Sequence, residues 1–255
     1  METYNTASLF SRNQPFIDDE TQKKLAGIKI ALIGVGLSSQ VALSLARAGI
    51  RRFTLWDHDV VSETNLNRQA FAGNDIGKNK AMIVAGHLQN INSDIEVSWH
   101  TNAFSSQNLD DLQGVDIAVN SADFNMPVIY KINDTMQEQG GWCIQPLNLG
   151  FGGACMIFGK DTPGLAEMTR GKQKEDAAFI QNLLNTCTGF EPGTELLAMG
   201  EKLLINSESS GWFPQNIIAT LITTSLITWG VVKIVSGNTA GILAPRLLHF
   251  EPKGD

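Results

Sequence analysis

Residues 28–59 of the 255-residue chain, IKIALIGVGLSSQVALSLARAGIRRFTLWDHD, contain the pattern that decides the fold. A short apolar run is followed by a G-V-G turn, by apolar residues at helical spacing, and by a second apolar run that ends at an aspartate. Such runs are typical of buried parallel strands on either side of a helix. The predicted segments are a strand at 28–33, a turn at 34–36, a helix at 38–48 and a strand at 52–56. This stretch is therefore predicted to form a β-α-β unit.

The same alternation continues toward the C-terminus. It predicts helices at 79–91, 106–112 and 127–139, and strands at 95–99, 115–120 and 142–146. Alternation of this kind indicates an α/β fold, a Rossmann-like doubly wound sheet that is mostly parallel and has helices on both faces.

The chain changes character after Asn148. A glycine-rich turn leads into an apolar strand within 149–158, and an uncharged run begins at Ile217. This run is shorter than the ~20 apolar residues that a membrane span needs, so a buried helix over 217–235 is predicted instead. One domain over 1–255 is expected, with a nucleotide-binding core at 27–158, an excursion with one or two helices at 159–210, and a C-terminal helix and strand at 211–255.

The composition limits the possible partners. The formal charge is 19 − 26 = −7, which argues against a nucleic-acid backbone as the main partner. No apolar signal segment is present near the N-terminus, so a cytoplasmic protein is expected. The three cysteines exclude a four-cysteine structural zinc site by count.

The first candidate site residues follow the predicted strands. Gly34 and Gly36 let a backbone approach a phosphate at a helix N-terminus, and Asp57 lies 57 − 36 = 21 residues after Gly36, where a carboxylate can bind ribose hydroxyls. The third glycine of the dinucleotide fingerprint is replaced by Ser39. A nucleotide is therefore predicted, and a nicotinamide cofactor is the default choice at this point.

The residues after Asp57 favour a different nucleotide. Asn65, Arg68, Gln69 and Lys80 bring amides and cations close to the glycine turn, where they can bind a triphosphate. Lys78 is interpreted as a solvated neighbour. Asp123 directly follows a predicted strand, and Mg²⁺ prefers one or two carboxylates together with phosphate oxygens. A magnesium triphosphate site fits these residues better than a dinucleotide site.

The chain also resembles the MoeB/ThiF/HesA adenylyltransferases, the superfamily that includes the ubiquitin-activating enzymes. The motifs that carry the resemblance are S-R-N-Q at 11–14, G-V-G at 34–36, D-H-D at 57–59, N-L-N-R-Q at 65–69, I-G-K-N-K-A at 76–81 and S-A-D at 121–123. The resemblance implies a ThiF-type adenylation domain that binds ATP and Mg²⁺. It would transfer AMP to a carboxylate of a peptide or of a small ubiquitin-like carrier protein, with release of pyrophosphate.

The resemblance also implies roles for individual residues. Asp57 would hold the ribose, Asn65, Arg68 and Lys80 would contact the phosphates, and Asp123 would hold Mg²⁺. Arg12 matches an arginine that such enzymes insert from the partner subunit, so a homodimer is expected.

The chain departs from the family pattern in two ways. The family's G-x-G-G-x-G is G-V-G-L-S-S here, and the cysteine that many members carry before the late helix is missing from S-E-S-S-G-W-F-P at 207–214. These departures leave a non-catalytic subunit of a heterodimer as a second hypothesis. A nicotinamide oxidoreductase is a third.

Three further residues carry competing interpretations. Cys187 is interpreted as an ordinary loop thiol, with a thiol-transfer role as the alternative. Trp212 and Phe213 either pack in the core or face the tail of a partner.

Overall fold

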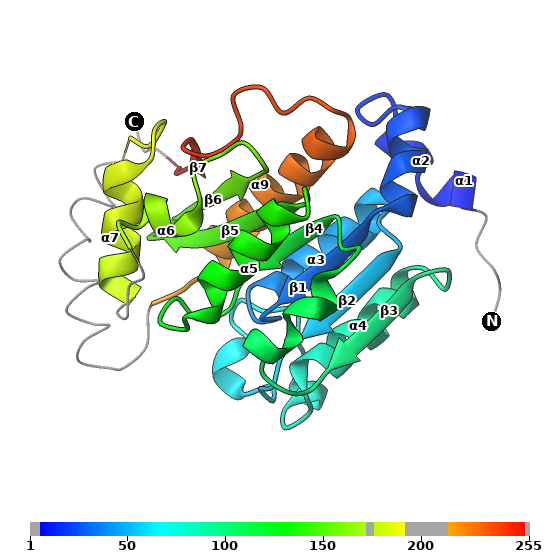
Figure 1. Ribbon diagram of the computed structural model, residues 1–255. Helices are drawn as coiled ribbons and strands as arrows, with labels where there is room; N and C mark the ends of the chain where they lie inside the picture. The colour runs from blue at the N-terminus through cyan, green and yellow to red at the C-terminus, as the bar shows by residue number, and fades with distance from the viewer. Residues whose placement is uncertain (1–5, 172–175, 192–213, 253–255) are drawn as a thin grey trace.

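The computed structural model describes residues 6–171, 176–191 and 214–252, which form a seven-stranded sheet between two layers of helices (Figure 1). The strands are β1 (Lys29–Ile33), β2 (Arg52–Trp56), β3 (Glu96–His100), β4 (Ile117–Asn120), β5 (Trp142–Leu149), β6 (Gly152–Phe158) and β7 (Leu247–Phe250). Their order is β3-β2-β1-β4-β5-β6-β7. The first five strands in this order are parallel, and β6 and β7 extend the sheet in antiparallel fashion. The predicted mostly parallel α/β sheet is confirmed.

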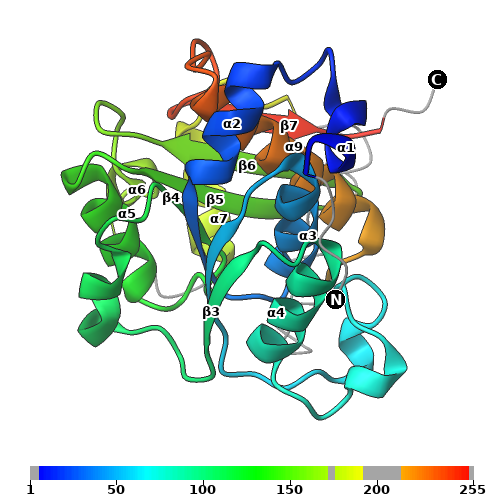
Figure 2. The same ribbon diagram turned by 90° about the vertical axis from the view of Figure 1, so that its right-hand side faces the viewer.

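Helices cover both faces of this sheet (Figure 2). The α-helices are α1 (Thr6–Leu9), α2 (Asp19–Gly27), α3 (Ser38–Ala48), α4 (Lys80–Ile91), α5 (Val128–Glu138), α6 (Leu165–Met168), α7 (Asp176–Thr186) and α9 (Ile217–Val235). Short 3-10 turns lie at η1 (Ser11–Asn13), η2 (Glu63–Asn65), η3 (Gly73–Asp75) and η4 (Ser106–Leu112). Helices α3, α4 and α9 pack on one face and α5, α6 and α7 on the other.

The two hydrophobic cores follow from the alternation of side chains along the strands. In β1, Ile30 and Leu32 belong to the core under α3, α4 and α9. Ala31 and Ile33 belong to the core under α5, α6 and α7. Successive side chains of a strand point to opposite faces of the sheet, so a strand buried on both sides must be apolar throughout.

The strand order creates a crevice beside β1. Chain connections leave β1 toward β2 on one side and return through β4 on the other, so the loops after β1 and β4 diverge at their carboxyl ends. Ligands of doubly wound sheets bind at such a switch point. Hydrogen bonds hold the neighbouring strand ends together, because Gly34 N donates to Trp56 O over 2.8 Å and Ser121 N donates to Ile33 O over 2.8 Å.

Helix α9 packs against β5, β6 and α3. Asn216 caps its N-terminus by accepting from Ala219 N over 3.0 Å, and Thr223 Oγ1 donates to Leu147 O over 2.9 Å. The helix passes directly over the backbone of Gly153, where a Cβ atom would lie 2.8 Å from Ala219 O and closer still to Thr223 N. Among the described helices, α9 has the length and apolar composition of a membrane span. The predicted helix is present, but it is buried only in part: one side packs on the sheet, and 39% of its apolar window is buried.

The excursion predicted at 159–210 is described only in part. Helices α6 and α7 lie within its described part. Residues 192–213 are outside the described residues, and with them Trp212 and Phe213.

The close contact at Gly153 leads to a stability prediction. Gly153→Ala forces α9 away from β6 and is expected to lower the free energy of unfolding by about 1–3 kcal/mol. A matched control is Gly86→Ala, on the exposed side of α4, where a Cβ meets nothing within 4 Å. The free energy of unfolding of this control is expected to rise by about 1 kcal/mol, since alanine is a better helix former than glycine. Urea denaturation measures both, and equal stability of the two variants would contradict the described packing.

Candidate functional site

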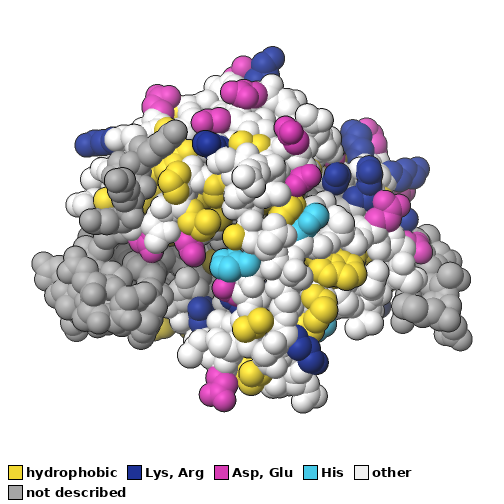
Figure 3. Space-filling model, turned by 60° about the horizontal axis from the view of Figure 1, so that its bottom comes forward, with side chains coloured by type: hydrophobic (Ala, Val, Ile, Leu, Met, Phe, Trp, Pro, Cys, Tyr) yellow, Lys and Arg dark blue, Asp and Glu magenta, His cyan; other side chains and the backbone are white. Residues whose placement is uncertain are grey.

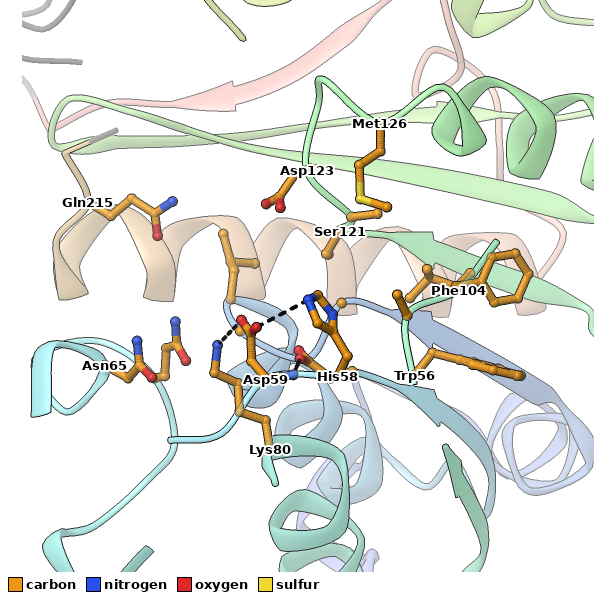
Figure 4. A pocket seen from close by; sticks show the side chains of 18 of the residues that line it. Trp56, His58, Asp59, Asn65, Lys80, Phe104, Ser121, Asp123, Met126 and Gln215 are labelled. Carbon is orange, nitrogen blue, oxygen red and sulfur yellow. Dashed lines mark hydrogen bonds and ion pairs between the residues drawn. The ribbon is translucent and has the colours of Figure 1, made fainter. Parts of the chain in front are cut away.

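A cavity of about 340 Å³ opens at the carboxyl ends of β1, β2 and β4 (Figure 4). All of the predicted site residues except Arg12 line it: Gly34, Gly36, Asp57, Asn65, Arg68, Gln69, Lys80 and Asp123. In Figure 4, Trp56 and Phe104 lie at one end, Asn65 and Gln215 at the other, and His58, Asp59 and Lys80 between them. The structure thus brings together residues from distant parts of the sequence.

The glycine turn is shaped by the close approach of two strand ends. Gly34 has φ +84°, and a Cβ at this position would overlap the carbonyl of Ser121. Glycine is therefore required here both by conformation and by space. Ser38 and Ser121 are joined by a hydrogen bond between their side chains.

Ser39 replaces a family glycine with a hydroxyl that makes two hydrogen bonds. Its Oγ donates to Gly36 O over 2.7 Å and accepts from Ala70 N over 2.9 Å. The side chain is fully buried. The altered motif therefore ties the glycine turn to the loop that carries Arg68 and Gln69.

Asp57 connects the glycine turn to the end of β2. Its Oδ2 accepts from Val35 N over 2.7 Å and its Oδ1 accepts from Asp59 N over 2.9 Å. Burial raises the pKa of this carboxyl, although the charge of Lys80 and both backbone donors oppose the rise. Each carboxylate oxygen keeps a further lone pair, so ribose hydroxyls can still donate to it.

Lys80 forms an ion pair at the centre of the cavity. Its Nζ lies 2.8 Å from Asp59 Oδ2, and the Lys80 side chain is 8% exposed, whereas that of Asp59 is 52% exposed. His58 Nε2 lies 3.4 Å from Asp59 Oδ1. Asp59 is not among the site residues predicted from the sequence. The sequence feature that could have identified it is the second acid of D-H-D, two residues after Asp57.

Arg68 is held by neutral partners at the edge of the cavity. Its Nε donates to Gln215 Oε1 and its Nη1 to Thr64 O and Asn67 Oδ1, each over 2.8 Å. Burial lowers the pKa of the guanidinium. Within the described residues Arg68 has no carboxylate partner, so its charge remains available to an anion.

Gln69 and Asn65 are buried beside Arg68. Gln69 Oε1 has no hydrogen-bond partner among the described residues, and its amide nitrogen faces Gly36. A buried polar atom without a partner suggests a ligand or water in the cavity. Asn65 Oδ1 instead accepts from Ser62 N over 3.0 Å, so this side chain also caps its own loop.

An aromatic wall, which the sequence analysis missed, closes one end of the cavity. The Trp56 ring stacks on His100 with ring centroids 3.6 Å apart, and its edge contacts Phe104 at 5.1 Å. Trp56 directly precedes Asp57 in β2, whereas Phe104 comes from the segment after β3. Both side chains are largely buried, and the ring atoms that line the cavity offer apolar contact to a heteroaromatic base.

Asp123 lies where the first cavity meets a second one. The second cavity has a volume of about 380 Å³, and Arg68, Asp123 and Gln215 line both. The Asp123 carboxylate makes no hydrogen bond or ion pair with any other described residue, so its oxygens can accept a cation. Burial and the nearby charge of Asp123 together raise the pKa of Asp176, which lines only the second cavity.

Arg12 is not brought to the cavity of its own chain. The neighbouring Asn13 donates through Nδ2 to Gln22 Oε1, and Gln22 donates to Ala48 O. Ala48 is the last residue of α3, whereas the cavity lies at the first turn of that helix. The exposed Arg12 side chain therefore does not line the cavity of its own chain.

The cysteines lie outside both cavities. Burial raises the pKa of Cys143 and of Cys155 to about 12. Burial also raises the pKa of Cys187, whose Sγ donates to Leu184 O over 3.3 Å. A reactive thiol needs a lowered pKa, so the interpretation of Cys187 as an ordinary thiol is favoured.

Comparisons with known proteins identify the family of this chain. The model of the ThiF family matches residues 10–254. Mouse "adenylyltransferase and sulfurtransferase MOCS3" is 33% identical over 143 residues, which are 55% of this chain and 31% of the relative. The "probable adenylyltransferase/sulfurtransferase MoeZ" of Mycobacterium tuberculosis is 31% identical over 152 residues, 58% of this chain and 38% of the relative. This chain thus spans about a third of these relatives.

Two solved structures share the fold. E. coli MccB crystallised with AMPCPP and MccA has a TM-score of 0.65 at 22% identity, covering 93% of this chain and 66% of that one. PaaA has a TM-score of 0.66 at 20% identity, covering 96% of this chain and 76% of that one. At these identities the likeness is one of fold.

The bonds of Ser39 lead to a prediction about the altered glycine motif. Ser39→Ala leaves the N–H of Ala70 without its partner and is expected to lower the free energy of unfolding by about 1–3 kcal/mol. Ser106→Ala, at an exposed position of η4 where the hydroxyl accepts from Lys131 Nζ, serves as the control and is expected to change the free energy of unfolding little. Thermal or urea denaturation compares the two. If Ser39→Ala is as stable as wild type, the hydroxyl does not hold the loop.

Proposed function

The chain belongs to the ThiF family, and we propose that it binds ATP with Mg²⁺ in the first cavity and transfers AMP to a carboxylate. The observation that carries this proposal is the arrangement of Lys80, Arg68 and Asp123 around one cavity behind a glycine turn. Of the two cations, Lys80 pairs with Asp59, and Arg68 has no carboxylate partner among the described residues. Such a pair of cations suits a polyphosphate, and the unpaired carboxylate of Asp123 suits its metal.

The shape of the cavity suggests how ATP lies in it. The adenine stacks at the end formed by Trp56 and Phe104. The ribose hydroxyls donate to Asp57, and the phosphates extend toward Lys80 and Arg68. The N-terminus of α3 points at the same place, and its dipole adds partial positive charge.

Asp123 is the residue that best fits Mg²⁺. The three carboxylates of the cavity provide oxygen ligands, which Mg²⁺ prefers. Asp57, His58 and Asp59 lie close enough together to hold a metal, but Asp57 is occupied by two backbone donors and Asp59 by Lys80. Asp123 alone of the cavity's aspartates lacks such partners within the described residues. When bound, Mg²⁺ neutralises negative charge on the phosphate oxygens.

The proposed reaction needs no nucleophile from the protein. A carboxylate oxygen of the acceptor attacks the α-phosphorus, the bond from that phosphorus to the oxygen bridging to the β-phosphate breaks, and pyrophosphate leaves. Lys80 and Arg68 stabilise the charge on the phosphates. Catalysis then consists of positioning and electrostatic stabilisation.

The second cavity is the natural place for the acceptor. It meets the first one at Asp123 and Arg68, so a carboxylate entering through it approaches the phosphates from the side opposite the adenine end.

We propose that the acceptor is a peptide or the C-terminal tail of a small carrier protein, and that the enzyme works in the cytoplasm. On the face shown in Figure 3, Lys and Arg side chains of the described residues form one group at the right, and the others are scattered among acidic side chains.

We also propose that two copies of the chain form a dimer. Helix α9 exposes Ile217, Ile218, Leu221 and Trp229 along one side, which is unusual for a helix that a monomer leaves in water. An isologous interface would cover this stripe. It would also allow Arg12 to reach the cavity of the partner.

Pyrophosphate exchange tests the adenylation step. With a suitable acceptor carboxylate and Mg²⁺, labelled pyrophosphate is expected to enter ATP, and removal of the metal with EDTA abolishes the exchange. If the protein neither binds ATP nor catalyses exchange with any acceptor, the proposed activity is wrong.

Substitution of Lys80 tests its contact with the phosphates. Lys80→Gln is expected to weaken ATP binding by about 10–100-fold, the equivalent of losing one hydrogen bond from a charged group. Lys78→Gln, a neighbouring exposed lysine, provides the control and is expected to stay within about twofold of wild type. Calorimetric titration with ATP measures the affinity of both variants. Unchanged affinity in Lys80→Gln would instead favour a non-catalytic subunit.

A mixing experiment tests the role of Arg12. Arg12→Ala and Lys80→Gln are each expected to be nearly inactive in pyrophosphate exchange. Unfolding and refolding them together forms mixed dimers, each with one intact cavity faced by an intact Arg12. Random pairing should then restore roughly a quarter of wild-type activity. No recovery, or a monomer in light scattering, would remove Arg12 from the mechanism.

A further inference from the structure

The second cavity contains a carboxylate that the proposed reaction does not use. Asp176 is the first residue of α7, and it lines the cavity together with Asn125, whose backbone lowers the pKa of the Asp176 carboxyl against the larger effect of burial. Its Oδ1 is buried and has no hydrogen-bond partner among the described residues. A buried carboxylate oxygen without a donor is costly, so the protein gains when a ligand supplies one.

The position of Asp176 is fixed by packing. The Phe124 ring stacks on Phe179 of α7 with centroids 4.5 Å apart and an interplanar angle of 7°. Phe179 is fully buried, and it lies one helical turn after Asp176. The carboxylate is therefore held against the segment 123–125 rather than carried on a free side chain.

The lining of the second cavity indicates what kind of group reaches Asp176. Phe124, Ile180 and Pro146 form apolar walls, and Asn125 and Asn148 provide amides. Arg68, the only cation among the described residues that line it, also lines the nucleotide cavity. An aliphatic chain that ends in a positive charge matches this lining, because the stem packs on apolar walls while the head pairs with a carboxylate.

We propose that Asp176 selects acceptors that carry a lysine or arginine side chain on the residue with the reacting carboxylate. The inference rests on the proposed adenylation, since the reacting carboxylate must lie at Asp123 and Arg68. An acceptor tail ending in two glycines has no side chain to place against Asp176. An acidic side chain is rejected there by like charge.

Short acceptors test this selection. The probes are N-acetylated tetrapeptides of three alanines followed by lysine, leucine or glutamate, assayed by pyrophosphate exchange with saturating ATP and Mg²⁺. Wild type is expected to show a KM for the lysine peptide at least about tenfold below that for the glutamate peptide, a difference of ~1.4 kcal/mol. Asp176→Asn should raise the KM for the lysine peptide by about tenfold, with kcat and the KM for ATP unchanged.

Two further variants keep the test decisive. Asp161→Asn, an exposed aspartate outside both cavities, is the matched control and should behave as wild type. Asp176→Lys should reverse the order, so that the glutamate peptide has the lower KM, which a loss of folding cannot produce. ATP titration of each variant shows whether the nucleotide cavity is intact.

The possible outcomes separate the two proposals. Exchange with all three peptides at equal KM, or a preference that Asp176→Asn leaves unchanged, overturns the role of Asp176 while the adenylation stands. A lower KM for the leucine peptide than for the lysine peptide overturns it as well. ATP binding without exchange by any acceptor, or no ATP binding at all, counts against the adenylation itself.

Discussion

The close approach of the ends of β1 and β4 is the constraint on which the rest of the site depends. Gly34 sits directly against the Ser121 carbonyl, and no side chain fits between them. This contact places the glycine turn beside the loop that carries Asp123. Asp57 then fixes the turn from the other side by accepting from Val35 N, and the same carboxylate holds the backbone of Asp59. The ion pair of Asp59 with Lys80 follows from this arrangement, so one steric contact and one carboxylate set the position of most charged groups in the cavity.

The C-terminal half of the fold supports this cavity from behind. The antiparallel strands β6 and β7 widen the sheet, and α9 covers them on the face that also carries α3. Gln215 leads into α9 and accepts from Arg68, so the start of this helix reaches the phosphate end of the cavity. Asn148 joins the two parts, because its side chain bonds to Thr220 and Thr223 of α9 while it lines the second cavity. The late helix, which sequence alone presents as an uncharged run, thus helps to build both cavities.

Much of this could be predicted from the sequence because it follows from local patterns. The segment 28–59 predicted β1, α3 and β2 within one residue, and the N-L-N-R-Q and K-N-K-A motifs identified residues that do line the cavity. What could not be predicted depends on contacts between distant segments. Trp56 and Phe104 form a wall only when the loop after β3 folds back on β2. Asp176 meets Asn125 only because two phenylalanine rings stack across 55 residues of chain. Similarly, the distance of Arg12 from its own cavity depends on where η1 docks, which no local spacing encodes.

The protein combines a net charge of −7 with a small number of cations placed where a polyphosphate would lie. We therefore expect a nucleotide to bind in the first cavity. The most direct measurement is a crystal structure with Mg²⁺ and α,β-methylene ATP, whose α,β linkage cannot be cleaved. We predict adenine against Trp56 and Phe104, the ribose at Asp57, the phosphates at Lys80 and Arg68, and the metal on Asp123. A nucleotide bound outside this cavity, or one whose phosphates lie at the aromatic end, would contradict this prediction.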